Sequence, residues 1–245
     1  MSVGIVVPCF NEAERWNEDY WRAMVDRVAA TFLFVDDGSS DETPALLEQL
    51  HDVSQVQVLT LPRNGGKAEA VRAGMNQLLG YADIDGVGYL DADGAFHQDD
   101  VVGIADIFSE RVATREFDAV WSSRVALSGR DIERSQSRHY VGRMVATYLS
   151  VSEASFPYDT QSGYKLFVDS ETLRRCLALP FVTRWLFEIE LLARWRRDSG
   201  APMQIWEEPL DYWHDVPGSK INFTESWRIV RELMKVKAEQ RRKAH

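Results

Sequence analysis

Residues 87–94, Val-Gly-Tyr-Leu-Asp-Ala-Asp-Gly, hold the pattern that decides the fold. The apolar run 87–90 is typical of a buried strand, and Asp91 and Asp93 follow it directly. Since side chains two residues apart in a strand point to the same side, the two carboxylates leave the strand end together. Such hard oxygen ligands suit Mg²⁺ or Mn²⁺, ions that usually bridge to a substrate phosphate. The pair taken alone is equally compatible with an acidic turn.

Further apolar runs extend the pattern on both sides, at residues 3–7, 32–35, 56–61 and 117–121. The segments between them have helical spacing, as in the apolar positions from Ala68 to Leu79. Ser39 and Glu42, just before Pro44, predict a capping box at a helix start. This alternation predicts an α/β fold with a mostly parallel central sheet and helices on both faces. Ligands of such sheets bind beyond the carboxyl ends of the strands.

Polar motifs follow the first three strands. They are Pro8-Cys9-Phe10-Asn11-Glu12, Asp36-Asp37-Gly38-Ser39-Ser40-Asp41 and, at a helix start, Arg63-Asn64-Gly65-Gly66-Lys67. Backbone amides at a helix start favour an anion, and so does the lysine. Together with the aspartate pair, these motifs predict a nucleotide pocket. No Gly-x-Gly-x-x-Gly follows the first strand, which disfavours a dinucleotide oxidoreductase.

Composition excludes several classes of protein. At 245 residues and 45% hydrophobic content, the chain forms one α/β domain or two small ones. No apolar run approaches the ~18 residues of a membrane-spanning helix, and no signal peptide precedes Val3. Two cysteines, Cys9 and Cys176, are no disulfide framework, so a cytoplasmic location is expected. The net charge of −10 argues against a nucleic-acid partner.

The charge is unevenly distributed. Residues 228–245 carry seven basic and two acidic side chains, a net charge of +5 that leaves −15 for the rest of the chain. We therefore predict a single catalytic domain over residues 1–224 and a basic C-terminal helix or tail over residues 225–245. This tail either lies on an anionic membrane surface as a peripheral contact or packs its apolar stripe on the domain.

The motifs resemble those of family 2 glycosyltransferases of the GT-A fold, above all the dolichyl- and polyprenyl-phosphate glucosyl- and mannosyltransferases. The resemblance covers roughly residues 3–224 and includes Ser123-Arg124 and the stretches 159–165, 184–191 and 213–220. It implies an inverting, metal-dependent transfer of a hexose to a polyprenyl or dolichyl phosphate. The stretch 159–165 is closer to the glucosyl members, which favours UDP-glucose over GDP-mannose as donor.

The resemblance assigns the donor side of the site. Pro8, Glu12 and Asp37 hold the nucleoside, and Lys67 lies near it. Asp91 and Asp93 hold the ribose, the diphosphate and a Mg²⁺ or Mn²⁺ ion, which takes up the negative charge that develops on the leaving group.

The resemblance also assigns a further metal ligand and the acceptor side. His214 is either a metal ligand or a surface histidine. The cationic candidates for the acceptor phosphate are Arg124, Arg138 and, less directly, Lys165, with Gln161 on the same side. Glu188 stands where many relatives carry a catalytic aspartate. It is either a base or, with the neighbouring Glu190, a charge that supports a helix start.

Other functions remain open. A family 2 glycosyltransferase can use a soluble acceptor such as a protein, a glycan or a small molecule. A nucleotide-sugar binding protein without turnover is a second alternative, which the intact aspartate pair argues against. A nucleotidyltransferase usually has a Gly-rich basic loop after the first strand, where this chain has Pro-Cys-Phe-Asn-Glu.

Overall fold

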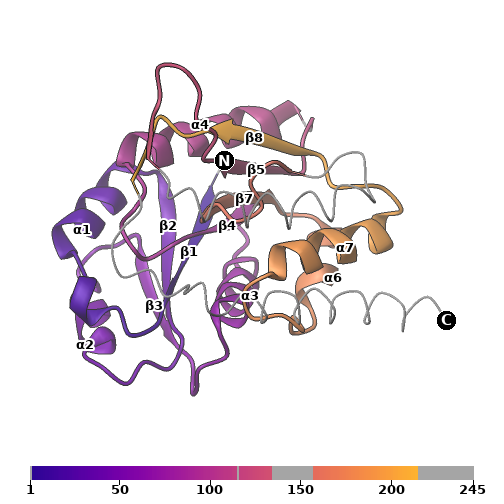
Figure 1. Cartoon of the computed structure of the whole chain (residues 1–245). Helices are drawn as coiled ribbons and strands as arrows, with labels where there is room; N and C mark the ends of the chain where they lie inside the picture. Colours follow the sequence, from indigo (N-terminus) through magenta and orange to yellow (C-terminus); the bar gives the residue numbers. More distant parts are fainter. Residues whose placement is uncertain (1, 115, 134–156, 215–245) are drawn as a thin grey trace, which may run out of the picture.

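A seven-stranded sheet forms the centre of the protein (Figure 1). The structure is a computed structural model that describes residues 2–114, 116–133 and 157–214. The strands lie in the order β3-β2-β1-β4-β7-β5-β8. Their bounds are β1 (Val3–Cys9), β2 (Ala30–Asp36), β3 (Val56–Thr60), β4 (Gly86–Leu90), β5 (Ala119–Ser123), β7 (Tyr164–Val168) and β8 (Ile205–Pro209). Neighbouring strands are parallel except at β7, which is antiparallel to both β4 and β5. The predicted mostly parallel sheet is confirmed.

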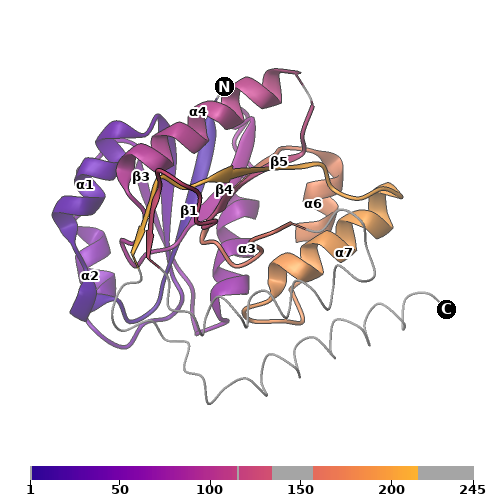
Figure 2. The ribbon, with the colours of Figure 1, turned by 45° about the horizontal axis from the view of Figure 1, so that its top comes forward.

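Helices cover both faces of this sheet (Figures 1 and 2). One face carries α1 (Glu18–Arg27), α2 (Thr43–Glu48) and α4 (Gln98–Thr114). The other face carries α3 (Lys67–Leu78), α6 (Glu171–Leu177) and α7 (Phe187–Ser199). A short 3₁₀ helix, η1 (Ala13–Arg15), precedes α1, and β6 (Asp131–Glu133) pairs with β9 (Tyr212–His214) in a separate two-stranded sheet.

The central strands are apolar at consecutive positions because each side of the sheet is covered. Ile5 and Val7 of β1 pack with Trp21 of α1, whereas Val6 packs with Val71 of α3. Successive side chains of a strand point to opposite faces, so a strand buried on both faces needs no polar alternation. This arrangement turns the carboxyl ends of β1, β2 and β4 toward a common edge.

The start of α2 differs from the predicted capping box. The helix begins at Thr43 after Glu42, and no side chain caps it. The Ser39 hydroxyl instead accepts a hydrogen bond from the Asn11 backbone amide at 2.9 Å. Asp41 accepts one from the Thr43 amide at 3.0 Å. The capping-box prediction was wrong because a contact with the β1 loop engages the Ser39 hydroxyl.

Parts of the predictions lie outside the described residues. Arg138 and the basic tail 225–245 belong to these parts. The division into a catalytic domain 1–224 and a tail therefore stays a prediction. Within the described ranges, no helix combines the length and the hydropathy needed to cross a bilayer.

Candidate active site

The loops after β1 and β2 are bound to one another at the carboxyl edge of the sheet. Besides the bond from Asn11 to Ser39, the Ser40 amide donates to Asn11 Oδ1 at 2.9 Å. Asn11 is the one non-glycine residue with positive φ, 50°, among the described residues, a conformation that asparagine tolerates better than most residues. Pro8, predicted to contact the nucleoside, is half-buried in β1 next to this turn. Hydrogen bonds thus join the loops after β1 and β2 into one surface.

The Asp37 carboxylate joins the loop after β2 to the loop before α3. Its two oxygens accept hydrogen bonds from the backbone amides of Gly65 and Gly66, each at 2.7 Å. Burial raises the pKa of Asp37, and the two amides and Arg184 oppose this rise. We predicted that the amides at this helix start would bind an anion, and the anion in the structure is Asp37 itself.

Lys67, the first residue of α3, pairs with Asp91 at the end of β4. Lys67 Nζ lies 2.6 Å from Asp91 Oδ1 and 5.0 Å from the centre of the Tyr89 ring. Burial lowers the pKa of Lys67, but Asp91, Glu188 and Asp93 outweigh burial and leave the pKa above its usual value. Lys67 therefore stays charged and neutralises Asp91.

The Asp93 carboxylate, unlike that of Asp91, forms no ion pair with a described residue. One of its oxygens accepts a hydrogen bond from the Ala95 amide at 3.1 Å. Burial and the neighbouring Asp91 raise its pKa. Arg15 of η1 is close enough to Asp93 and Asp91 to interact with their charges. Its hydrogen bond to the buried Glu12 raises the pKa of Arg15, and Asp93 and Asp91 add to this rise.

Arg15 is a functional candidate that the sequence analysis missed. It comes shortly after Glu12 in the loop that follows the first strand, and that position was the available signal. The carboxylates of Asp93 and Asp91 offer hard oxygen ligands and are a donor set that fits a hard divalent cation.

His214 is not grouped with this aspartate pair. It lies on β9 beside Asp131 and Glu133 of β6, the only trio of potential metal-ligating side chains found in the described part of the chain. His214 Nε2 is 3.3 Å from Asp131 Oδ1, and Tyr212 Oη is 3.1 Å from His214 Nδ1.

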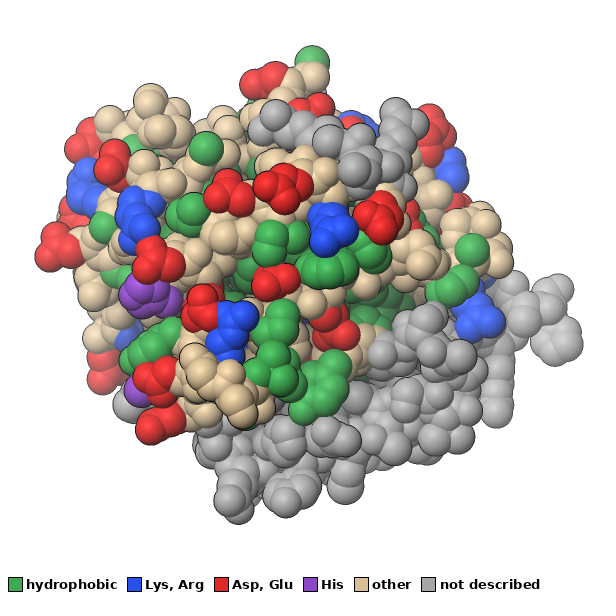
Figure 3. Space-filling model, turned by 90° about the horizontal axis from the view of Figure 1, so that it is seen from above, with side chains coloured by type: hydrophobic (Ala, Val, Ile, Leu, Met, Phe, Trp, Pro, Cys, Tyr) green, Lys and Arg blue, Asp and Glu red, His purple; other side chains and the backbone are tan. Residues whose placement is uncertain are grey.

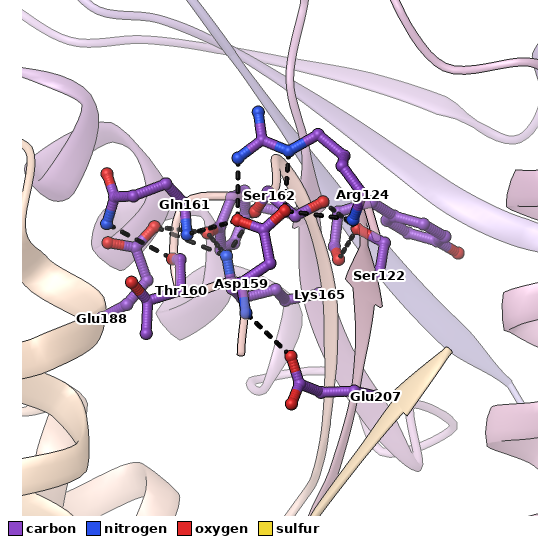
Figure 4. A network of polar contacts seen from close by, with 11 residues as sticks. Ser122, Arg124, Asp159, Thr160, Gln161, Ser162, Lys165, Glu188 and Glu207 are labelled. Carbon is purple, nitrogen blue, oxygen red and sulfur yellow. Dashed lines mark hydrogen bonds and ion pairs between the residues drawn. The ribbon is translucent and has the colours of Figure 1, made fainter. Parts of the chain in front are cut away.

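Arg124 follows β5 and pairs with Asp159 in a forked arrangement (Figure 4). Its Nε and Nη2 each lie 2.8 Å from a different oxygen of Asp159, and its guanidinium lies 5.0 Å from the Trp213 ring. Glu207 of β8 accepts from the backbone amides of Tyr158 and Asp159 at 2.7 and 2.9 Å. A substrate phosphate at Arg124 would therefore share the guanidinium with Asp159 or displace Asp159.

The loop before β7 packs directly against Asp91. The Gly163 carbonyl accepts from the Asp91 amide at 2.9 Å. A Cβ on Gly163 would lie 2.9 Å from Asp91 Cβ and closer still to its carboxylate, so only glycine fits. Gln161, predicted on the acceptor side, is half-buried in the same loop, and its backbone amide donates to Asp159 at 3.2 Å.

Lys165 has no exposed surface and its Nζ is engaged inside the protein, which does not fit the predicted contact with an acceptor phosphate. Its Nζ donates to Tyr89 Oη at 2.9 Å and to the Ser162 carbonyl. It also lies 4.8 Å from the Trp121 ring. Burial lowers the pKa of Lys165 to about 8, although Glu188 opposes the shift.

The two carboxylates at the start of α7 have different surroundings. Glu190 accepts from the backbone amides of Val182 and Thr183 at 2.9 and 3.2 Å, so it holds the loop before the helix. Glu188 is 2% exposed and accepts from Tyr89 Oη at 2.6 Å through Oε1. Its Oε2 has no hydrogen-bond partner within the described chain.

Comparison with known proteins adds sequence evidence. A family model described as "Glycosyl transferase family 2" matches residues 4–169. The chain is 27% identical to a dolichyl-phosphate beta-glucosyltransferase of Trichomonas vaginalis over 94% of this chain and 69% of that protein. It is 25% identical to one of Dictyostelium discoideum (96% and 73% covered) and 29% identical to one of Homo sapiens (92% and 71% covered).

Two solved structures resemble the whole described architecture. Glucosyl-3-phosphoglycerate synthase from Mycobacterium tuberculosis, in complex with phosphoglyceric acid, has a TM-score of 0.63 at 18% identity, with 96% of this chain and 79% of that chain covered. A mannosyltransferase from Pyrobaculum calidifontis, in complex with GDP-Man and Mn²⁺, has a TM-score of 0.59 at 18% identity, with 98% and 64% covered. These similarities confirm the predicted fold.

Proposed function

The chain belongs to glycosyl transferase family 2 and has the GT-A fold, and on this premise we propose that it transfers a hexose from a nucleotide sugar to a polyprenyl or dolichyl phosphate with inversion. Glucose from UDP-glucose is the favoured donor, and GDP-mannose is the second choice. Support comes from the dolichyl-phosphate beta-glucosyltransferases, which align with 92% to 96% of the chain.

The observation that carries the proposal is the meeting of Asp91 and Asp93 with two cations, Lys67 and Arg15, at the carboxyl edge of the sheet. A nucleotide sugar leaves a diphosphate whose negative charge grows as the bond to the sugar breaks. Lys67 and Arg15 would bind that diphosphate. Asp93, assisted by Asp91, would hold Mg²⁺ or Mn²⁺, an ion that supplies neutralising charge for the leaving group when bound.

We assign the nucleoside to Pro8, Glu12 and Asp37. Pro8 lies near the end of β1, and Glu12 and Asp37 lie in the loops after β1 and β2, which hydrogen bonds hold together. A carboxylate fixed in this way accepts hydrogen bonds from ribose hydroxyls or from the imide of uracil. Binding then requires little reordering of the protein.

We assign the acceptor phosphate to Arg124, with Gln161 nearby in the loop before β7 and Arg138 as a further residue to be tested. A phosphate acceptor is already anionic, so it needs positive charge more than it needs a base. The guanidinium of Arg124 is held in place by Asp159, and its fork geometry suits phosphate as well as carboxylate.

A peripheral membrane contact through the basic tail, at the cytoplasmic face, is part of the proposal. The face seen from above carries acidic side chains spread over its surface, with fewer basic ones (Figure 3). An anionic bilayer would repel such a face, so the contact has to come from a cationic part of the chain.

One observation favours a second candidate function, transfer to a soluble hydroxyl acceptor. A hydroxyl nucleophile needs a base to remove its proton. Glu188 is a buried carboxylate with one unpartnered oxygen among the described residues, which suits that role.

Product formation tests the proposal. The full chain is incubated in detergent with polyprenyl phosphate, radiolabelled UDP-glucose or GDP-mannose, and Mg²⁺, Mn²⁺ or EDTA. We expect a sugar-labelled lipid phosphate from UDP-glucose with a divalent cation, loss of this product in Asp93→Ala, and no loss in the exposed control Asp83→Ala. Label found only on water-soluble acceptors would replace this proposal with the second candidate. No transfer to any acceptor would reject both.

A further inference from the structure

A buried polar cluster surrounds Tyr89, which lies beside Leu90 at the end of β4. Tyr89 Oη is 2.9 Å from Lys165 Nζ on β7 and 2.6 Å from Glu188 Oε1 on α7. Tyr89 and Lys165 have no exposed surface, and Glu188 is 2% exposed. Figure 4 shows Lys165 and Glu188 within the polar network that extends to Arg124. Three elements far apart in the sequence therefore meet at one phenol oxygen.

The chemistry of these groups fixes the direction of both hydrogen bonds. A lysine ammonium has donors only, and an ionised carboxylate has acceptors only. A phenol has one hydrogen and can also accept. Lys165 must therefore donate to Tyr89, and Tyr89 must donate its hydrogen to Glu188 Oε1. This chain of bonds holds the carboxylate in one orientation.

The orientation leaves Glu188 Oε2 without a hydrogen-bond partner in the described chain. A buried polar atom in this state is rare and costly. Glu190, on the same helix turn, shows the contrast: its Oε2 accepts from Val182 and Thr183, and its Oε1 lies 2.7 Å from Arg194. Both oxygens of Glu190 are held by the protein, whereas Glu188 is held at Oε1 alone among the described residues.

The cluster lies next to the Asp91–Lys67 pair. Lys67 Nζ is 5.0 Å from the Tyr89 ring, and Lys165 Nζ is 5.3 Å from the same ring. Although burial lowers the pKa of Lys67, both Asp91 and Glu188 raise it. Glu188 is thus within electrostatic reach of the residues that would bind the donor diphosphate.

We propose that Tyr89 and Lys165 are positioning residues, which hold Glu188 so that its Oε2 accepts a hydrogen bond from a hydroxyl of the donor sugar. The inference rests on the proposed function: a lipid phosphate brings no hydroxyl to the site, and the ribose hydroxyls are assigned to Glu12 and Asp37, so the hydroxyls left for Glu188 are those of the sugar. Glu188 then selects the sugar and need not act as a base.

Donor binding, measured by titration calorimetry without acceptor, tests this inference. The ligands are UDP, UDP-glucose and the 2-, 3-, 4- and 6-deoxy analogues of UDP-glucose. The wild type should bind one analogue about tenfold more weakly than UDP-glucose, the loss expected for one hydrogen bond to a charged group. In Glu188→Gln, Tyr89 still engages the amide oxygen, so the NH₂ takes the place of Oε2 and donates instead of accepting. A neutral NH₂ that can only donate to the hydroxyl replaces a charged acceptor, so the difference between UDP-glucose and that analogue should fall to about threefold or less.

Tyr89→Phe separates positioning from general structure. It should abolish the same discrimination, and it should have no further effect in the Glu188→Gln background, because both changes act through one carboxylate. Tyr164→Phe is the matched control, since this fully buried tyrosine of β7 bonds only weakly, at 3.4 Å, to the Val101 carbonyl. If Tyr89→Phe does not fold, Lys165→Met replaces it in the experiment, and we expect the same loss of discrimination between UDP-glucose and the deoxy analogue.

Three results would overturn the inference. One is a wild type that binds all analogues equally, and another is Tyr89→Phe or Lys165→Met that discriminates as well as the wild type. The third is an equal loss of discrimination in Tyr164→Phe. A failure of the proposed acceptor leaves these binding results intact, so the two failures are distinguishable.

Discussion

The Lys67 ammonium and Asp91 Oδ1 lie 2.6 Å apart and join the start of α3 to the end of β4. The backbone amide of Asp91 also donates to the Gly163 carbonyl at 2.9 Å. Asp91 is therefore anchored and neutralised within the protein itself. Among the described residues, Asp93 forms no such ion pair, and burial and the charge of Asp91 raise its pKa. This difference supports the proposal that Asp91 acts as an anchor and that Asp93 holds the cation.

This difference predicts the metal dependence of donor binding. With Mg²⁺ or Mn²⁺, UDP should bind at least about tenfold more tightly than in EDTA, because the cation lowers the repulsion between the diphosphate and Asp93. Asp93→Ala should remove most of that increment and keep the fold. Isothermal titration with and without metal checks the prediction, and equal affinities in the wild type would contradict it.

Gly163→Ala tests the anchor. The added Cβ would overlap the Asp91 carboxylate, so we expect a loss of about 1–3 kcal/mol in the free energy of unfolding from overpacking and a large loss of transfer activity. Gly103→Ala in α4 is the control, because the added Cβ would meet no described atom within 4 Å beyond its chain neighbours and the local helix backbone, and there alanine should stabilise the helix by roughly 1 kcal/mol. Urea unfolding measures both. A Gly163→Ala protein as stable as wild type would refute the close packing.

Arg15→Ala tests the cation missed in the sequence. Its charge lies near Asp93 and Asp91, so its removal should weaken UDP binding by about three- to tenfold, and more at low salt, where screening is weakest. Arg27→Ala, which removes an exposed pair with Asp99, should have no effect on UDP binding. An unchanged affinity in Arg15→Ala would remove this residue from the donor site.

Arg124→Ala separates acceptor binding from stability. It should raise the KM for polyprenyl phosphate far more than it changes UDP binding. It should also destabilise the protein and lower the melting temperature, because the buried Asp159 loses its ion pair with the Arg124 guanidinium; breaking a buried pair costs about 3–5 kcal/mol of unfolding free energy. Adding Asp159→Asn should restore much of the melting temperature but not the KM. Recovery of both by the double variant would show that Arg124 acts only through structure.

The buried Lys165 predicts a pH dependence of stability. Its pKa is about 8 in the folded protein because of burial, whereas an unfolded lysine titrates near about 10.4. Between these values the unfolded chain binds more protons, so this group makes the free energy of unfolding rise with pH. The stability of the wild type relative to Lys165→Met should therefore increase by up to about 3 kcal/mol over this range. Urea titrations at about pH 7 to 10 measure the increase, and a flat difference would exclude the lowered pKa.

The sequence by itself determined the elements and the edge at which the site lies. Apolar runs without polar alternation mark strands buried on both faces, and this is why β1, β2 and β4 begin and end within about two residues of the predicted bounds. The order of the motifs then placed Asp37, Lys67, Asp91 and Asp93 at one edge, because the carboxyl ends of parallel strands meet there. The resemblance carried by the same motifs gave the family.

Only the tertiary structure decided which partner each charged side chain has. Periodicity does not encode strand direction, so the antiparallel insertion of β7 between β4 and β5 was not predictable. That insertion buries Lys165 against Tyr89. The packing of α7 then gives Glu188 and Glu190 different hydrogen-bond partners, the Tyr89 hydroxyl and the Val182 amide. Asp37 likewise accepts hydrogen bonds from the Gly65 and Gly66 amides, which the sequence analysis had predicted to bind an anionic ligand. Coulomb and hydrogen-bond energies depend on distances across the fold, and a linear pattern of residues does not contain those distances.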